Sequence, residues 1–230
     1  MVTIPLTDLD QLFPDSDGKP MSDNTEQFRW IVLLKENLEI LFANDPLVFV
    51  AGDLLWYPEL STLVPSVAPD VMVVFGRPKG RRGSYRQWQE ENIPPQVVFE
   101  ITSPSNTSAE MTRKLEFYQC YGVEEYYLYD PDRNRLQGWL RQGSELSEIT
   151  DLHGWISPRL GICFQPGEPE LEIYYPEGKQ FLSSVKLSQR ADQAEQQVER
   201  EKQRAEEAEQ RLDQLTAYLR SQGINPEDLP

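Results

Sequence analysis

The stretch QVVFEIT, residues Gln96–Thr102, decides the fold that this sequence predicts. It is almost wholly apolar, which is typical of a strand buried on both faces of a sheet. A carboxylate in such a strand costs free energy unless a cation or a hydrogen-bond donor neutralises it. Side chains alternate along a strand, so Glu100 and Thr102 lie on the same face. Glu100 therefore indicates a functional site, and the alternative is a strand end whose acid faces solvent.

Helices and strands predicted on either side of this strand make the domain α/β. Thr25–Ala43 has apolar residues at helical spacing. A second helix, Ser108–Tyr121, follows a capping box of Thr107 and Glu110 and ends before Gly122. Further strands are predicted at Leu47–Tyr57, Val71–Phe75 and Glu125–Asp130, with short alternating strands over Leu136–Tyr175. These elements predict one mixed central sheet flanked by helices.

The C-terminal part, Lys179–Gly223, changes character, because Glu, Gln, Arg and Ala dominate it. Its apolar residues follow a four-three spacing, interrupted at Glu201, which is the heptad pattern of a coiled coil. Alanine buries little surface, so a single solvated helix is the alternative. We predict a loose, flexible N-terminal arm over residues 1–20, a domain over 21–182 and a helical, coiled-coil-like tail over 183–230. The heptad positions are Leu187, Ala191, Ala194, Val198, Ala205, Ala208, Leu212, Leu215 and Leu219.

Charge and composition narrow the classes of function. The net charge of −16 is unlike that of a protein that coats nucleic acid through Lys and Arg. The segment Val71–Gln89 is nevertheless basic and contains no acidic residue. Its cations are predicted to contact a polyanion, and the alternative is a solvated basic loop. The residues assigned to phosphate contacts are Arg77, Lys79, Arg81 and Arg82.

The sequence also predicts a compartment. It has no run of about 18 apolar residues that would cross a membrane. Its first twenty residues carry neither a basic start nor an apolar stretch, so no secretory signal is expected. The two cysteines, Cys120 and Cys163, do not indicate a disulfide framework. We therefore expect a cytoplasmic protein.

Two further residues point to the same site as Glu100. Asp70 directly precedes the strand Val71–Phe75. If that strand neighbours Gln96–Thr102, then Asp70 and Glu100 converge into an oxygen site for Mg²⁺ or Mn²⁺, and the alternative for Asp70 is a turn residue. On a helical wheel Lys114 falls inside an apolar arc, so it must reach solvent or meet an anion. That anion is either Glu100 or a substrate phosphate, unless Lys114 belongs to a structural ion pair.

The segments Pro69-Asp70 and Glu100-Ile101-Thr102, followed by Lys114 in the next helix, resemble the PD-(D/E)XK nuclease superfamily, which has the restriction-endonuclease-like fold. Within it, the stretch from residue 51 to 132 is similar to the Uma-two family of endonucleases. The resemblance extends over about residues 25–175. The segments that carry it are Ala68-Pro69-Asp70-Val71, Val98-Phe99-Glu100-Ile101-Thr102-Ser103-Pro104-Ser105, and Tyr118–Pro131 with Gly122-Val123-Glu124-Glu125-Tyr126-Tyr127.

The resemblance implies a metal-dependent endonuclease that hydrolyses DNA phosphodiester bonds with Mg²⁺ or Mn²⁺. Asp70 and Glu100 would hold the ion, with the Ile101 carbonyl and Asp53 as further ligands. The superfamily's third motif ends in a lysine two residues after the glutamate, and here Thr102 stands at that position. A lysine relocated to the following helix is typical of this branch. Lys114 therefore takes that role, and Thr102 is expected to hydrogen-bond the attacking water.

A second hypothesis assigns the same fold to a protein without activity. It would bind nucleic acid or other proteins and assemble through its coiled coil. The absence of the usual lysine at Thr102 and the acidic composition favour this alternative. In either case we expect a homodimer formed through the tail, unless the tail docks onto its own domain.

Overall fold

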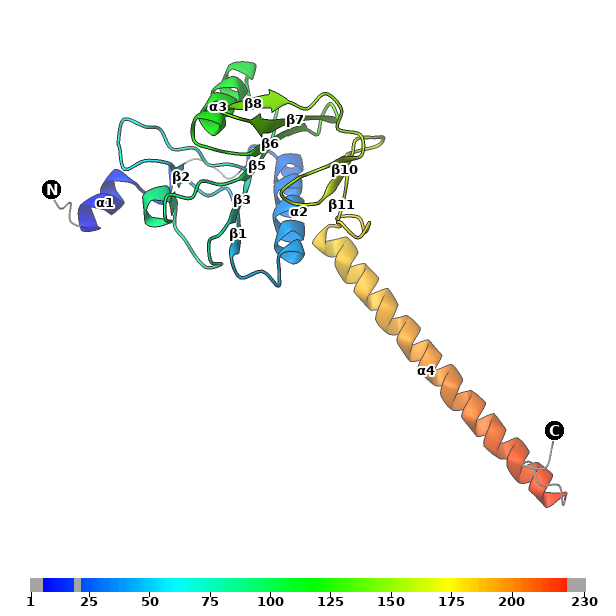
Figure 1. The fold of residues 1–230 in the computed structure, drawn as a ribbon. Coiled ribbons are helices and arrows are strands. Elements are labelled where there is room, and N and C mark those ends of the chain that lie inside the picture. Colours follow the sequence, from blue (N-terminus) through cyan, green and yellow to red (C-terminus); the bar gives the residue numbers. More distant parts are fainter. Residues whose placement is uncertain (1–5, 19–21, 223–230) are drawn as a thin grey trace. The chain divides into compact units, whose positions relative to one another are not determined.

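The computed structural model describes residues 6–18 and 22–222. The chain divides into two compact units, residues 1–182 and 183–230. Among the described residues, the first unit contains all three sheets and every helix except α4, and the second contains the long helix α4 (Figure 1).

A six-stranded mixed sheet forms the centre of the first unit, in the order β1-β3-β5-β6-β7-β8. Neighbouring strands are antiparallel except β5 and β6, which run parallel. A parallel pair requires a crossover connection, and helix α3 (Ser108–Cys120) supplies it. The strands are β1 (Val48–Gly52), β3 (Val71–Phe75), β5 (Val97–Ile101), β6 (Glu125–Asp130), β7 (Arg135–Gln142) and β8 (Glu145–Glu148). The mixed sheet predicted from the sequence is confirmed.

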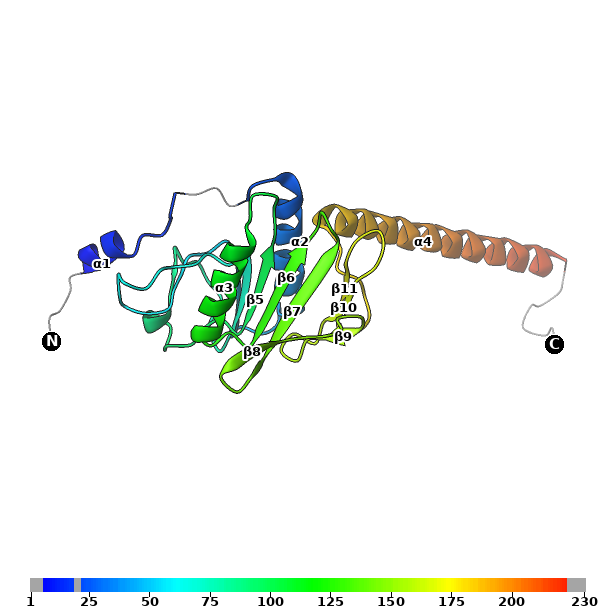
Figure 2. The same ribbon diagram turned by 90° about the horizontal axis from the view of Figure 1, so that it is seen from above.

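One helix packs on each face of this sheet (Figure 2). Helix α2 (Thr25–Leu41) covers the face to which Phe99 and Ile101 of β5 contribute. Helix α3 covers the opposite face, where Val98 packs with Tyr118. Strand β5 is therefore buried on both faces, which is why its sequence is nearly all apolar.

Shorter elements complete the first unit. A three-stranded sheet of β9 (Trp155–Ile156), β10 (Cys163–Gln165) and β11 (Glu172–Tyr174) joins the core on the α2 face. The predicted strand Leu47–Tyr57 is two strands, β1 and β2 (Trp56–Tyr57), separated at Asp53. Strand β2 pairs with β4 (Tyr85–Arg86). Strand β4 and a short 3₁₀ helix, η1 (Gln87–Gln89), lie at the C-terminal end of the basic segment Val71–Gln89.

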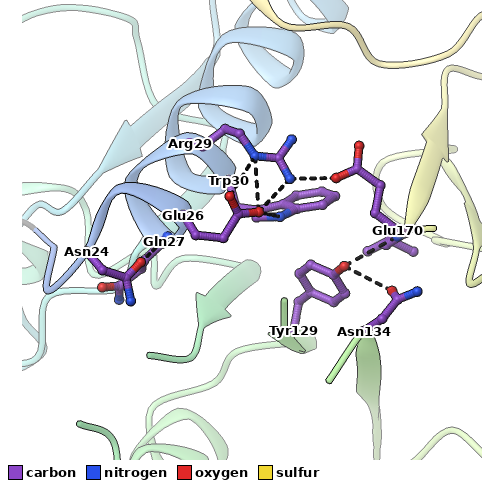
Figure 3. Close-up of polar contacts among 9 residues, drawn as sticks. Asn24, Glu26, Gln27, Arg29, Trp30, Tyr129, Asn134 and Glu170 are labelled. Atoms are coloured by element: carbon purple, nitrogen blue, oxygen red, sulfur yellow. Dashed lines mark hydrogen bonds and ion pairs between the residues drawn. The ribbon is translucent and has the colours of Figure 1, made fainter. Parts of the chain in front are cut away.

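Polar contacts fix the start of helix α2 (Figure 3). The side chain of Asn24 caps the helix by accepting a hydrogen bond from the Gln27 amide at 2.8 Å. Arg29 bridges Glu26 of its own helix and Glu170, both at 2.6 Å. Near them, the Tyr129 hydroxyl donates to Asn134 at 3.0 Å. The first turn of α2 is thus held both to itself and to the segment that precedes β11.

The described part of the N-terminal arm packs more closely than a loose arm would. Its helix α1 spans Leu6–Leu12. Phe13 is buried against Tyr57 and Trp88, and the Tyr57 hydroxyl donates to the Pro14 carbonyl at 2.7 Å. Phe13 packs against the aromatic rings of Tyr57 and Trp88, which belong to the domain. The sequence of the arm alone does not predict this contact.

Helix α4 (Ser184–Ser221) makes up the described part of the second unit. The Ser183 hydroxyl caps it by accepting from the Lys186 amide. None of its residues is buried, and Leu212 and Leu215 are 65% and 62% exposed. Among the residues that the structure describes, no helix has the length and apolar character needed to cross a membrane.

Candidate active site

The strand register places three acidic residues in one row across the sheet. Val71 of β3 pairs with Phe99 of β5, so the preceding residue, Asp70, lies opposite Glu100. Gly52 of β1 pairs with Val71, so Asp53 follows opposite Asp70. Directly paired residues of neighbouring strands point to the same face. Here that is the face covered by α3.

Glu100 is the most buried member of this row, and both of its oxygens have partners. Its side chain is 3% exposed. The Lys114 ammonium lies 2.7 Å from Oε2, and the Tyr118 hydroxyl donates to Oε1. Both partners come from α3, four residues apart, so one face of that helix supplies a cation and a hydroxyl to the same carboxylate. The wheel had placed Lys114 on the inward arc, and the helix does direct it to Glu100.

Asp70 lies next to Glu100 and is held by the backbone of β5. Its Oδ2 accepts a hydrogen bond from the Ile101 amide at 2.6 Å. Burial, and then the charge of Glu100, raise the pKa of Asp70 well above its usual value, while Lys114 opposes them. Burial disfavours the charge on Lys114, but Glu100 and Asp70 outweigh it and raise the pKa of Lys114. The site thus brings two carboxyl groups close to one ammonium group.

Asp53 forms the outer end of the row. Its backbone is left-handed, with φ +47°, a conformation that Asp tolerates better than most residues. Its amide donates to the carbonyls of Pro69 and Asp70 at 3.1 and 3.2 Å. Burial, and then the charge of Asp17 in the arm, raise the pKa of Asp53 to about 6. Asp53 therefore belongs to the electrostatic surroundings of the site.

Gln27, which the sequence did not single out, also contacts this edge of the sheet. Its Nε2 donates to the Ile101 carbonyl at 2.9 Å, and the residue is buried. The carbonyl assigned to a metal ion thus already has one partner. In the sequence, Gln27 is a polar residue in the first turn of a helix. Exposed glutamine is common at that position, so nothing in the sequence indicates that Gln27 contacts the site.

Thr102 lies on the α3 face but makes few contacts. Its amide donates to the Tyr129 carbonyl at 2.8 Å, and its hydroxyl lies 3.5 Å from the same oxygen. Its side chain lines a pocket of about 460 Å³ between α3 and the strands β6 and β7, together with Met111 and Tyr126. The structure therefore places Thr102 beside the acidic row, without a contact to Asp70, Glu100 or Lys114 among the described hydrogen bonds.

Tyr126 has a buried hydroxyl that finds no hydrogen-bond partner among the described residues. Burial, and then the charges of Glu100 and Asp70, raise the pKa of Tyr126 well above its usual value. The ring packs against Tyr118 and stacks on Trp139. In sequence, Tyr118 and Tyr126 look like core residues, because aromatic side chains at apolar positions carry no separate signal for their hydroxyl groups.

The basic segment differs from a freely solvated patch. Glu90 accepts from Arg77 at 2.9 Å and from Arg82 at 2.6 Å. Lys79 donates to the Phe42 carbonyl at 2.7 Å. Arg81 is exposed. The four cations predicted to contact phosphate therefore do not act as one group, because a carboxylate just beyond the segment engages two of them.

No cluster of three or more His, Cys, Asp or Glu side chains is arranged to hold a metal ion in residues 6–18 and 22–222. Asp70 and Glu100 remain a pair of neighbouring carboxylates, and Asp53 does not complete a three-residue cluster with them.

Comparisons with known proteins identify the family. A family model named Uma2, described as "Putative restriction endonuclease", matches residues 19–162, more than half of the chain. No curated protein matches the chain. Solved structures that match include the crystal structure of "a putative nuclease belonging to DUF820 from Anabaena variabilis ATCC 29413". That structure is 16% identical in sequence, with a TM-score of 0.44, and the match covers 62% of this chain and 78% of that one. By the family match, the chain belongs to the Uma2 family.

Proposed function

We propose that this protein is a metal-dependent endonuclease that hydrolyses phosphodiester bonds in DNA. The observation that carries the proposal is the buried Glu100, paired with Lys114 and lying opposite Asp70. Burying two acids side by side costs free energy that a purely structural role would not require. Membership of a restriction endonuclease family supports the same reading.

The residues present fit a magnesium or manganese ion. Mg²⁺ commonly uses one or two protein carboxylates and completes its shell with waters and substrate phosphate oxygens. Asp70 and Glu100 meet that requirement, and the Ile101 carbonyl is the proposed additional ligand, while Asp53, which does not complete a three-residue cluster, would act through its charge. The unpartnered Tyr126 hydroxyl beside them supports a hydrated site, because a buried donor calls for an acceptor. When bound, such an ion lowers the pKa of water and neutralises phosphate charge.

The chain's own groups then have separate tasks. Lys114 would place a positive charge beside the scissile phosphate and would stabilise the negative charge that develops on it during the reaction. Tyr118 would keep Glu100 in place from the other side by its hydrogen bond. Thr102 is proposed to hydrogen-bond the attacking water, since its hydroxyl has only a long contact to Tyr129. Arg81 and its neighbours would contact phosphates flanking the cut.

The proposal is tested by incubating the full chain with supercoiled plasmid and with single-stranded DNA, in Mn²⁺, in Mg²⁺ and in EDTA. We expect cleavage only with metal, and a loss of about 100-fold or more in Glu100→Gln and Lys114→Ala, as for removal of other groups that stabilise a transition state. Asp130→Asn is the matched control, because Asp130 is a partly buried acid at the end of β6 that pairs with Arg133. Equal cleavage by all variants would contradict the assignment.

A second candidate is a nuclease-fold module that binds DNA or protein without cutting. Thr102 at the position of the usual lysine favours it. It predicts that the wild type binds DNA but leaves it intact in every metal tested. This candidate would be supported if the wild type does not cleave DNA in Mn²⁺ and if Glu100→Gln still binds DNA.

A further inference from the structure

We propose that helix α4 pairs with α4 of a second copy of this chain as a parallel, in-register, two-stranded coiled coil. The inference goes beyond the proposed endonuclease activity and does not depend on it. In the heptad, Ala191, Val198 and Leu212 occupy position a, and Leu187 and Leu215 occupy position d. These residues line one side of a helix in which no residue is buried. The remaining positions of the seam are Ala205 and Leu219 at a, and Ala194, Glu201 and Ala208 at d.

The charged residues beside the seam determine the direction of pairing. In a parallel pair, each residue at position g faces the residue at position e of the partner's next heptad. Arg190 at g then meets Glu195 at e of the second copy, and Arg204 meets Glu209. By the twofold symmetry each pair occurs twice. All four residues are exposed, and none of the ion pairs within the described residues involves them.

An antiparallel pair would not use these charges. There, position g faces g of the partner and position e faces e. The g positions hold arginine, glutamine and tyrosine, so no register gives an attractive pair along that edge. Pairing about the middle of the helix would also bring Glu195 against Glu209. The parallel arrangement is therefore the one that the charge pattern favours.

The interruption of the seam at Glu201 fits the same arrangement. Glu201 occupies position d and would face its own copy in a parallel pair. A residue at d enters a hole that is formed by four residues of the partner helix, one of which is the following residue at e. Here that residue is Lys202, so each Glu201 meets a lysine of the second copy. A polar residue at one seam position also sets the register, at a cost in stability.

Sedimentation of the full chain tests the pairing. We expect the wild type to dimerise, and the double variant Arg190→Glu/Arg204→Glu to raise the dissociation constant at least 10-fold by placing glutamates at both g and e. Glu195→Arg/Glu209→Arg should raise the dissociation constant similarly, because it places arginines at both g and e. A mixture of the two variants should form a heterodimer. The matched control is Arg200→Glu/Arg220→Glu, which makes the same charge change at positions b and c and should leave the dimer intact.

Oxidative cross-linking tests the direction. In a chain carrying Cys120→Ser and Cys163→Ala, Ala194→Cys places a thiol at position d. In a parallel, in-register pair this thiol faces its own copy and should form a covalent dimer, whereas antiparallel pairing about the helix centre separates the two by about 25 Å. Gln196→Cys, at the outer position f, is the control and should not cross-link.

Several outcomes would overturn the proposal. A monomeric wild type at 100 µM would exclude the pair and favour docking of α4 onto its own chain. If neither charge reversal changes the dissociation constant of the dimer, the contact between the copies lies outside α4. Failure of Ala194→Cys to cross-link in a protein that is still dimeric would reject the parallel direction.

Discussion

Glu100 and Lys114 show how much a single residue reveals in the sequence. An acid in an apolar strand and a lysine on an apolar helical arc both require a partner, and each is the other's partner at 2.7 Å. Gln27, Tyr118 and Tyr126 carry no comparable signal. A glutamine in a first turn and tyrosines in a core are ordinary. Only tertiary packing brings Gln27 to the Ile101 carbonyl and Tyr118 to Glu100, and leaves the Tyr126 hydroxyl without a partner among the described residues.

Loss of Lys114 should destabilise the protein. Lys114→Met leaves the charge of Glu100 buried and without its cation, which should lower the free energy of unfolding by about 3 kcal/mol. Lys35→Met is the control, because Lys35 forms an exposed pair with Glu39 and should change stability by less than about 0.5 kcal/mol. Urea unfolding in EDTA measures both. A Lys114→Met protein as stable as the wild type would mean that the buried Glu100 does not need Lys114 as a partner.

Metal binding at Asp70 and Glu100 should appear as stabilisation. A ligand at 100 times its dissociation constant that binds only the native state raises the free energy of unfolding by about 2.7 kcal/mol. We expect Mg²⁺ or Mn²⁺ to raise the Tm of the wild type, and Asp70→Asn to abolish that rise. Asp130→Asn should retain it. Scanning calorimetry measures the Tm of each protein. An equal rise in the wild type and in Asp70→Asn would mean that the ion binds elsewhere.

At the scale of elements, the sequence pattern predicted correctly those helix and strand boundaries that are set by residues close in sequence. Helix α3 begins with the Thr107 cap, whose hydroxyl accepts from the Glu110 amide, and Gly122 follows its end with φ +90°. Strands β3 and β6 have the predicted bounds. The break at Asp53 was missed because its left-handed backbone is stabilised by the carbonyls of Pro69 and Asp70, which are distant in sequence. The pairs of Arg77 and Arg82 with Glu90 do not show in the sequence of the basic segment, because Glu90 lies just outside it.

The basic segment should therefore divide into two kinds of residue. If it contacts DNA, Arg81→Ala should reduce the slope of log K against log salt by about 0.9, the value for one lost phosphate contact. Arg77→Ala is the comparison, because Arg77 pairs with Glu90 and Glu91 and its loss should lower stability as well. Fluorescence anisotropy over a salt series, with urea unfolding of both variants, measures these effects. An unchanged slope in Arg81→Ala would leave the segment as solvated surface.

At the scale of the whole molecule, the chain joins a domain with one candidate site to a long helix that has no buried residue. The sequence predicted this helix because heptad periodicity is local and repeats along the chain. It predicted neither the direction nor the register of pairing from the apolar residues alone. Those follow from the charges at e and g and from the position of Glu201 and Lys202, once the helix is known to be continuous from Ser184 to Ser221.

Pairing through α4 should change which product the proposed nuclease makes. One site cuts one strand, so a monomer should convert supercoiled plasmid to nicked circles. A parallel coiled coil begins at the same end in both copies, so it tethers both domains there and raises the local concentration of the second site. In Mn²⁺ we expect the wild type and Arg200→Glu/Arg220→Glu to yield linear plasmid early in the reaction.

Arg190→Glu/Arg204→Glu alone should accumulate nicked circles, because its site is intact but unpaired. Adding Glu195→Arg/Glu209→Arg should restore linear product, since the two variants together recover every opposite-charge pair. The ratio of linear to nicked plasmid at equal total cleavage is the measurement, because it separates pairing from catalytic rate. If that ratio is the same for the paired and unpaired proteins, the coiled coil serves some purpose other than bringing two cuts to one duplex.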